Sequence, residues 1–161
     1  MRRLICERRN GSGVLPLPLI LRQAVTGEIN LSHRSLGDKA MKIFAEVLDL
    51  MPNLKSLNIR DNRLTDVSLE LFIFAVCHPG AKDRGCGSLL SLDISENDLD
   101  MKSVLQLADF IDNNPVLESL YLSKSDLDDH EIAIFCRALE SNSNLKKLDF
   151  FDHLCGVLGF W

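Results

Sequence analysis

A template of about eleven residues recurs five times along this chain, and the repetition limits the possible folds more than any other feature. The five copies are 26–36, 54–64, 89–99, 117–127 and 145–155. Positions equivalent to Leu31 fall at Ile59, Ile94, Leu122 and Phe150, so the successive spacings are 28, 35, 28 and 28 residues. A strand template that recurs at such a period is typical of a solenoid, in which each repeat buries its apolar face against its neighbours.

Four segments between the strand templates carry apolar residues at the spacing of a helix. In the first, Met41, Phe44, Ala45, Val47 and Leu48 lie at i, i+3, i+4, i+6 and i+7, which is one face of an α-helix. The equivalent residues of the other three segments are Leu69, Phe72, Ile73, Ala75 and Val76; Val104, Leu107, Ala108, Phe110 and Ile111; and Ile132, Phe135, Cys136, Ala138 and Leu139. Each repeat is therefore predicted to be a strand, a turn, a helix and a return loop.

The expected helix boundaries follow from polar residues and prolines. Asp38, Asp66 and Asp129 share one position at the predicted helix starts, where a carboxylate accepts hydrogen bonds from free backbone N–H groups. Prolines near residues 52, 79 and 115 mark helix ends, because the residue before proline avoids the helical region. Residues 14–23 are predicted to form a short helix that begins at its prolines and covers the first repeat.

The second and third templates have the spacing L-x-x-L-x-L-x-x-N-x-L, with Asn62 and Asn97 at the asparagine position. With this spacing and 28-residue units, residues 26–155 resemble leucine-rich repeat proteins of the ribonuclease-inhibitor-like subfamily. Arg34, Ser125 and His153 replace the asparagine elsewhere, so we expect the terminal repeats to be less regular.

The resemblance implies an α/β solenoid: a right-handed arc with parallel strands on its concave face and helices on its convex face. We divide the chain into an N-terminal segment with a short capping helix (1–25), a repeat domain of five strand units and four helices (26–155), and an apolar tail (156–161).

Composition points to a soluble protein of a reducing compartment. The net charge of −5 disfavours nucleic acid as a partner, since phosphate binding relies on a basic surface. The first apolar run, 14–21, is broken by Pro16 and Pro18, too short for a membrane span and a poor signal-peptide core. Five cysteines without framework spacing fit free thiols, and Cys136 is expected in the helix core. A cytoplasmic location is predicted.

Motifs for catalysis or for cofactors are not found. The sequence contains no Gly-x-Ser-x-Gly elbow, Walker loop or His-Glu-x-x-His motif, so neither an enzyme nor a cofactor is predicted. Cys77, His78 and Cys86 offer three zinc ligands but no fourth at an accepted spacing. The four histidines form no constellation along the sequence, and no metal site is predicted.

Residues that alternate with the buried leucines of the strands point outward and form the predicted binding surface. Tyr121 and Arg60 stand out on it, because Tyr and Arg are enriched at binding hot spots. The alternative is that both are ordinary solvated strand residues. The predicted contact residues on the concave face are Asn58, Arg60, Asp93, Tyr121, Ser123, Lys147 and Asp149.

The seven extra residues of the second repeat lie in the return loop 78–88. Insertions in repeat proteins map to loops and often bind partners, and Lys82 and Arg84 give this loop positive charge. We predict a second contact there. The alternative is a tolerated surface insertion, which costs little loop entropy.

These features predict a non-catalytic module that binds a partner protein through its concave face and the 78–88 loop. One alternative is a regulator of a small GTPase, similar to the Ran activator, which would use Asp61, Glu96, Lys124 and Asp152 at the rim after the strands. The other is a fragment of a longer leucine-rich repeat receptor or scaffold.

The C-terminal sequence leaves two readings open. No helix follows the fifth strand template, and residues 154–161 are mostly apolar, whereas a solenoid normally ends in a polar capping repeat. The preferred reading is a truncated array whose uncapped edge self-associates. The alternative is a tail that folds back as a cap, with Trp161 buried.

Overall fold

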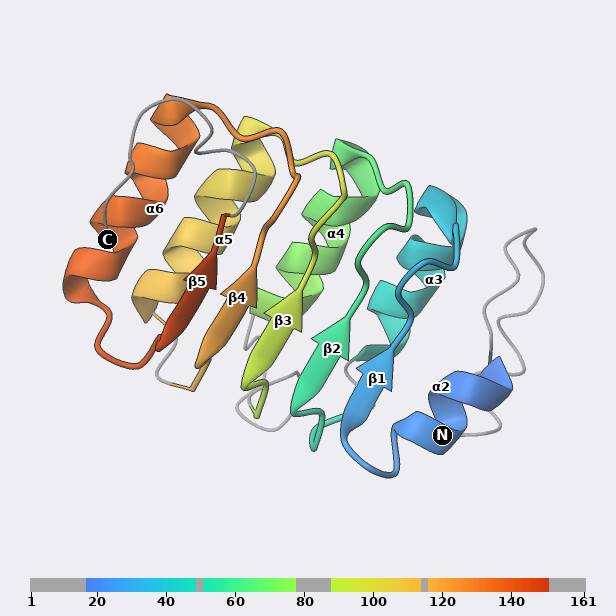
Figure 1. The fold of residues 1–161 in the computed structure, drawn as a ribbon. Helices are drawn as coiled ribbons and strands as arrows, with labels where there is room; N and C mark the ends of the chain where they lie inside the picture. Colours follow the sequence, from blue (N-terminus) through green and yellow to red (C-terminus); the bar gives the residue numbers. More distant parts are fainter. Residues whose placement is uncertain (1–16, 49–50, 78–87, 114–115, 151–161) are drawn as a thin grey trace.

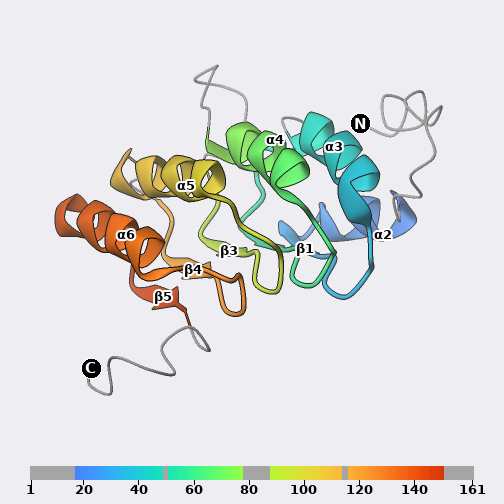
Figure 2. The same cartoon turned by 90° about the horizontal axis from the view of Figure 1, so that it is seen from above.

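The computed structural model describes residues 17–48, 51–77, 88–113 and 116–150. After a short helix, α2 (Leu17–Gln23), strands and helices alternate, and all four helices lie on the same side of the strands (Figures 1 and 2). The strands are β1 (Glu28–Asn30), β2 (Ser56–Asn58), β3 (Ser91–Asp93), β4 (Ser119–Tyr121) and β5 (Lys147–Asp149). The helices are α3 (Gly37–Leu48), α4 (Asp66–Cys77), α5 (Met101–Asn113) and α6 (Asp129–Ser141).

The five strands form one parallel sheet in the order β1-β2-β3-β4-β5. Leu57 pairs with Ile29 on one side and Leu92 on the other, as the alignment of the repeats predicts. The α/β solenoid expected from the sequence is therefore confirmed. Each strand pairs only with the strands before and after it in the sequence, because each helix returns the chain to the start of the next strand.

Main-chain hydrogen bonds continue beyond the three-residue strands. The N–H of His33 donates to the carbonyl of Arg60 at 3.0 Å, and the N–H of Asp61 donates to the carbonyl of Ser95 at 3.0 Å. These bonds hold the turns after β1 and β2 in the same register as the strands. Side chains at the rim of the sheet consequently stack from repeat to repeat.

The core lies between the sheet and the helices. Leucines and isoleucines of the strands face it, together with several apolar residues of each helix. At one equivalent position the helices contribute four residues that are all 0% exposed: Phe44, Phe72, Leu107 and Phe135. Residues 14–16 of the expected N-terminal helix lie outside the described residues, but Ile20 of α2 is buried against the first repeat.

Two buried asparagines join consecutive repeats. The Asn97 amide donates to the carbonyls of Ile59, Ile94 and Ser95, and its Oδ1 accepts from the N–H groups of Asn62 and Leu64. The Asn62 amide has the same role in the preceding repeat, donating to three carbonyls. A buried backbone group without a partner is unfavourable, so these side chains allow a sharp turn inside the solenoid.

The helices α4 and α6 begin at Asp66 and Asp129 as predicted, but the capping residue differs from the prediction. Asp128, rather than Asp129, caps α6, because its Oδ1 accepts from the Glu131 N–H at 2.8 Å. The Glu131 carboxylate accepts from the Asp128 N–H at 3.0 Å, which completes a capping box. Asp100 caps α5 by accepting from the Ser103 N–H at 2.8 Å. The mismatch arises because a cap lies just before the first helical turn, whereas Asp66 and Asp129 lie within it.

Asp38 lies in the first turn of α3 but bonds to the start of α4. It accepts from the Thr65 N–H at 3.0 Å, from the Thr65 hydroxyl at 2.9 Å and from the Ser68 hydroxyl at 2.6 Å. Burial raises the pKa of Asp38, but the hydrogen bonds from Ser68 and Thr65 outweigh it and lower the pKa below its ordinary value. Asp38 therefore fastens two repeats together in its charged form.

Asp38→Ala is expected to lower the free energy of unfolding by about 1 kcal/mol at neutral pH, as for loss of a helix cap. Because the folded-state pKa is lowered, this stabilisation is complete above the ordinary carboxyl pKa of about 3.9 and is lost as the pH falls through the folded value. Urea unfolding at neutral and acidic pH measures the difference. Asp98→Ala, at an exposed loop position, is the control, and an equal effect of both variants would contradict the inter-repeat role.

The last described repeat is less covered than the others. Cys136, predicted in the core, is an exposed free thiol, whereas its equivalents Ala45, Ile73 and Ala108 are 7%, 0% and 7% exposed. The earlier residues lie beside the helix of a following repeat, and no described helix follows α6. Phe150 is likewise only partly buried, with its ring 5.5 Å from that of Phe135.

Two expectations concern residues outside the described ranges. These are the tail 156–161 and nearly all of the loop 78–88. Among the described residues, no helix combines the length and apolar character that a membrane span needs.

Candidate interaction surface on the strand face

The outward side chains of β1–β5 line up across the sheet and form one surface, which we call the strand face. Figure 1 shows the five strands side by side, with the helices behind them. The pairing places the two outward columns as the sequence predicts: Glu28, Ser56, Ser91, Ser119 and Lys147; and Asn30, Asn58, Asp93, Tyr121 and Asp149. Most of these residues are half-buried or exposed, so the face is polar and accessible.

Among the described residues of this face, Tyr121 is the aromatic one, and Lys147 lies against its ring. The Lys147 Nζ atom lies 4.6 Å from the centre of the Tyr121 ring, within the range of a cation–π interaction. The strand pairing makes Tyr121 the neighbour of both Asp93 and Asp149. Two of the predicted contact residues are thus brought into direct contact.

Asn58 and Asp93 serve the local backbone as well as the surface. The Asn58 amide donates to Asp93 Oδ2 at 2.9 Å. Asn58 Oδ1 accepts from the Arg60 N–H at 3.0 Å, and Asp93 Oδ1 accepts from the Ser95 N–H at 3.1 Å. These two residues shape the turn after their strands, a role that accounts for an Asn or Asp there without any partner protein.

Arg60 is paired with Glu96 of the following repeat. The Arg60 Nη2 atom lies 2.5 Å from Glu96 Oε1, and the Lys124 Nζ atom lies 3.7 Å from the same oxygen. The hydrogen bond to Glu96 raises the pKa of Arg60; burial opposes this rise, and the charges of Glu96, Asp93 and Asp149 add to it. The bond from Arg60 lowers the pKa of Glu96, burial opposes that change, and the Arg60 and Lys124 charges reinforce it.

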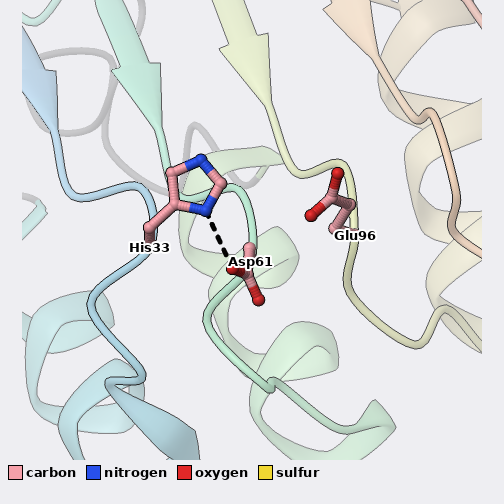
Figure 3. Close-up of side chains that lie close together, drawn as sticks. All are labelled: His33, Asp61 and Glu96. Carbon is pink, nitrogen blue, oxygen red and sulfur yellow. Dashed lines mark hydrogen bonds and ion pairs between the residues drawn. The ribbon is translucent and has the colours of Figure 1, made fainter.

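A further cluster, which sequence reasoning missed, lies at the rim where the strands end. His33, Asp61 and Glu96 follow β1, β2 and β3, and one ligand atom of each lies within 4.8 Å of those of the other two. Figure 3 shows His33 bonded to Asp61, with Glu96 beside them. The His33 Nδ1 atom lies 2.8 Å from Asp61 Oδ2. The expectation that the histidines join no constellation is wrong, because the three residues are one repeat apart and match no short motif. Aligning the repeats and inspecting each column for ligating residues would have found them.

Other predicted contact residues are placed less favourably. Ser123 is only 9% exposed, and its backbone lies within the continuing main-chain ladder, its carbonyl accepting from the Glu96 N–H at 2.9 Å. Ser123 is thus buried and does not contribute to the open surface. Lys82 and Arg84 lie outside the described residues.

Comparisons with known proteins agree with the leucine-rich repeat pattern of the sequence. A family model described as "Leucine Rich repeat" matches residues 50–72. The human "NACHT, LRR and PYD domains-containing protein 14" is 29% identical over 171 residues, which cover 91% of this chain and 15% of that protein. The chain thus spans less than a sixth of this relative's length.

Two solved structures are similar in fold. The first, titled "Leiomodin-1 Actin-Binding Site 2 (ABS2)", has a TM-score of 0.69 at 15% identity and covers 89% of this chain and 83% of its own. The second is the tropomodulin C-terminal domain of Caenorhabditis elegans, with a TM-score of 0.64 at 12% identity, covering 84% and 83%. At these identities the likeness concerns the fold.

Proposed function

Because this chain is a leucine-rich repeat protein, we propose that it is a protein-binding module whose strand face contacts a partner protein. The carrying observation is the Tyr121–Lys147 pair, an aromatic side chain and a cation held together on an accessible polar sheet. The 28-residue units, with helices of 12 or 13 residues, support placing the chain in the ribonuclease-inhibitor-like subfamily.

The centre of the proposed contact comprises Tyr121, Lys147 and Arg60, with Asn58, Asp93 and Asp149 around them. Tyr and Arg side chains dominate the energetics of many interfaces. Tyr121 and Arg60 already have partners that orient them, so little side-chain entropy remains to be lost on binding. Charges of both signs lie close together here, which favours a partner of matching pattern over a uniformly charged polymer.

Tyr121→Ala is expected to weaken binding of the partner by about tenfold or more, corresponding to at least about 1.4 kcal/mol. Arg60→Ala should act in the same direction. Lys102→Ala, on the exposed side of α5, is the matched control and should bind as the unchanged protein does. Titration calorimetry or surface plasmon resonance provides the measurement.

Purified monomeric actin is a defined first ligand for this titration, because one protein of similar fold is titled an actin-binding site. Affinity purification followed by mass spectrometry supplies further ligands to be purified and titrated. If every purified ligand binds the Tyr121→Ala and Arg60→Ala proteins as tightly as the unchanged protein, the strand face is not the site.

The loop 78–88, with Lys82 and Arg84, is proposed as a second contact on the strength of its length and charge.

The alternative function is regulation of a small GTPase, which the alignment of Asp61, Glu96 and Lys124 along one rim supports. Asp61 is paired with His33, and both Glu96 and Lys124 belong to one ion cluster, so these groups would have to exchange partners to act beside a nucleotide. A GTP hydrolysis assay over a panel of small GTPases tests this role, and an unchanged rate throughout would dismiss it.

Three further proposals rest on the sequence. The module acts in the cytoplasm, because its cysteines lack the spacing of a disulfide framework. It belongs to a longer repeat array, as the similarity to a small share of a much longer protein supports. Self-association through the β5 edge is the third proposal, and light scattering over a range of concentrations tests it.

A further inference from the structure

His33, Asp61 and Glu96 occupy the same position in three consecutive repeats. Each is the fifth residue after the first residue of its strand, and each has a left-handed backbone, with φ of 56°, 48° and 56°. Each N–H donates to a carbonyl of the following repeat, at 3.0, 3.0 and 2.9 Å. The sheet therefore fixes the backbones of all three residues and directs their side chains to one edge.

The ligating atoms of the three side chains are close enough for one ion. One nitrogen or oxygen atom from each residue lies within 4.8 Å of the corresponding atoms of the other two. Ligands around a tetrahedral ion with bonds of about 2.0–2.1 Å are about 3.3 Å apart. His33 Nδ1 and Asp61 Oδ2, at 2.8 Å, would move slightly apart as the ion replaces their hydrogen bond. The Glu96 carboxylate would approach them by rotation of its long side chain.

We infer that His33, Asp61 and Glu96 form a binding site for a divalent transition-metal ion, with Zn²⁺ as the best match. One imidazole nitrogen and two carboxylate oxygens supply three protein ligands, and water supplies the fourth. Imidazole distinguishes this set from the all-oxygen sets that Ca²⁺ and Mg²⁺ prefer. The side chains are 59%, 44% and 25% exposed, so an ion can reach them from solvent.

The neighbouring cations set the strength of the site. Arg60 and Lys124 both contact Glu96 through Oε1, and their charges oppose that of the metal. Because both contacts use the same oxygen, Glu96 Oε2 is the atom that would bind the ion. We therefore expect a moderate-affinity site that clamps the turns after β1, β2 and β3 together. This clamp operates whether or not the strand face binds a protein.

The test is titration of the full chain with Zn²⁺ alone, monitored by calorimetry and by competition with a fluorescent zinc chelator. His33→Asn should weaken Zn²⁺ binding at this site by at least about tenfold, since even residues that only support a ligand contribute that much. Asparagine tolerates the left-handed backbone at this position, so the turn is preserved. Glu96→Gln is the second variant, and circular dichroism checks that both proteins fold.

His130→Asn is the matched control, because His130 is an exposed histidine on α6 far along the stack, and it should bind Zn²⁺ as the unchanged protein does. Co²⁺ in place of Zn²⁺ distinguishes this site from the cysteines, because thiolate ligands give a strong charge-transfer band that imidazole and carboxylates do not. Zn²⁺ affinity that is equal in the unchanged, His33→Asn and Glu96→Gln proteins, or a bound Co²⁺ spectrum with only thiolate character, would overturn the inference. So would the absence of Zn²⁺ binding, or Ca²⁺ and Mg²⁺ binding as tight as that of Zn²⁺.

Discussion

Phe72→Ala is expected to lower the free energy of unfolding by about 3–5 kcal/mol, the usual effect of removing a buried aromatic ring. Phe72 is 0% exposed, and its helix α4 packs between α3 and α5. In a solenoid each repeat is stabilised by its neighbours. A cavity in a central repeat therefore weakens the contacts on both sides, and a loss of this size is a large fraction of the roughly 5–15 kcal/mol typical of a domain.

Phe74→Ala, two residues along the same helix, is the matched control. Phe74 is 50% exposed, so its replacement is expected to lower the free energy of unfolding by less than about 1 kcal/mol. Chemical denaturation followed by circular dichroism measures both variants under identical conditions. Equal losses for the two would mean that α4 does not face the sheet in the orientation described.

Asn97→Ala is expected to destabilise the protein by about 3 kcal/mol or more, although it removes only a small polar group. The Asn97 side chain hydrogen-bonds five backbone groups, three carbonyls and two N–H groups, from its buried position. Alanine leaves them without this partner, and each unsatisfied buried group costs roughly 1–3 kcal/mol. Water entering the gap is the reason to expect less than the full sum.

Asn30→Ala provides the comparison for Asn97. Asn30 is an exposed asparagine at the end of β1 whose Oδ1 accepts from the N–H and hydroxyl of Ser32. Its loss should change the free energy of unfolding by about 0.5 kcal/mol. Urea unfolding compares the two variants. Equal stability of the two variants would mean that the hydrogen bonds of the buried asparagines are not a main source of stability.

The hydrogen bonds of the buried Asn62 side chain also support the two proposed sites. Asn62 donates to the carbonyl of Arg60 at 3.1 Å and accepts from the Leu36 N–H at 3.3 Å, so it fixes the turns that follow β1 and β2. These turns carry Arg60 of the strand face and both His33 and Asp61 of the proposed metal site. Asn62→Ala removes these bonds and should therefore weaken Zn²⁺ binding as well as stability. Zn²⁺ titration of this variant measures the effect.

The repeat period by itself determined the fold and the register of the sheet. Once Leu31, Ile59 and their equivalents are aligned, side chains in strands must alternate between the core and the surface. Tyr121 and Lys147 could therefore be assigned to the outer face from the alignment of the repeats alone. The buried positions of Phe44 and Phe72 followed in the same way from the 3.6-residue period of the helices.

Only the tertiary structure decided how residues of different repeats meet. Cys136 has the helix position of Ile73, but no described helix of a following repeat lies beside it, so burial depends on the neighbour rather than on the period. Asp38 bonds to the next helix rather than to its own. His33, Asp61 and Glu96 converge because the left-handed turns of three repeats stack along one edge, and residues 28 and 35 positions apart carry no motif that a linear sequence can display. Local periodicity fixes which way a side chain points, whereas its partners depend on what the neighbouring repeat presents.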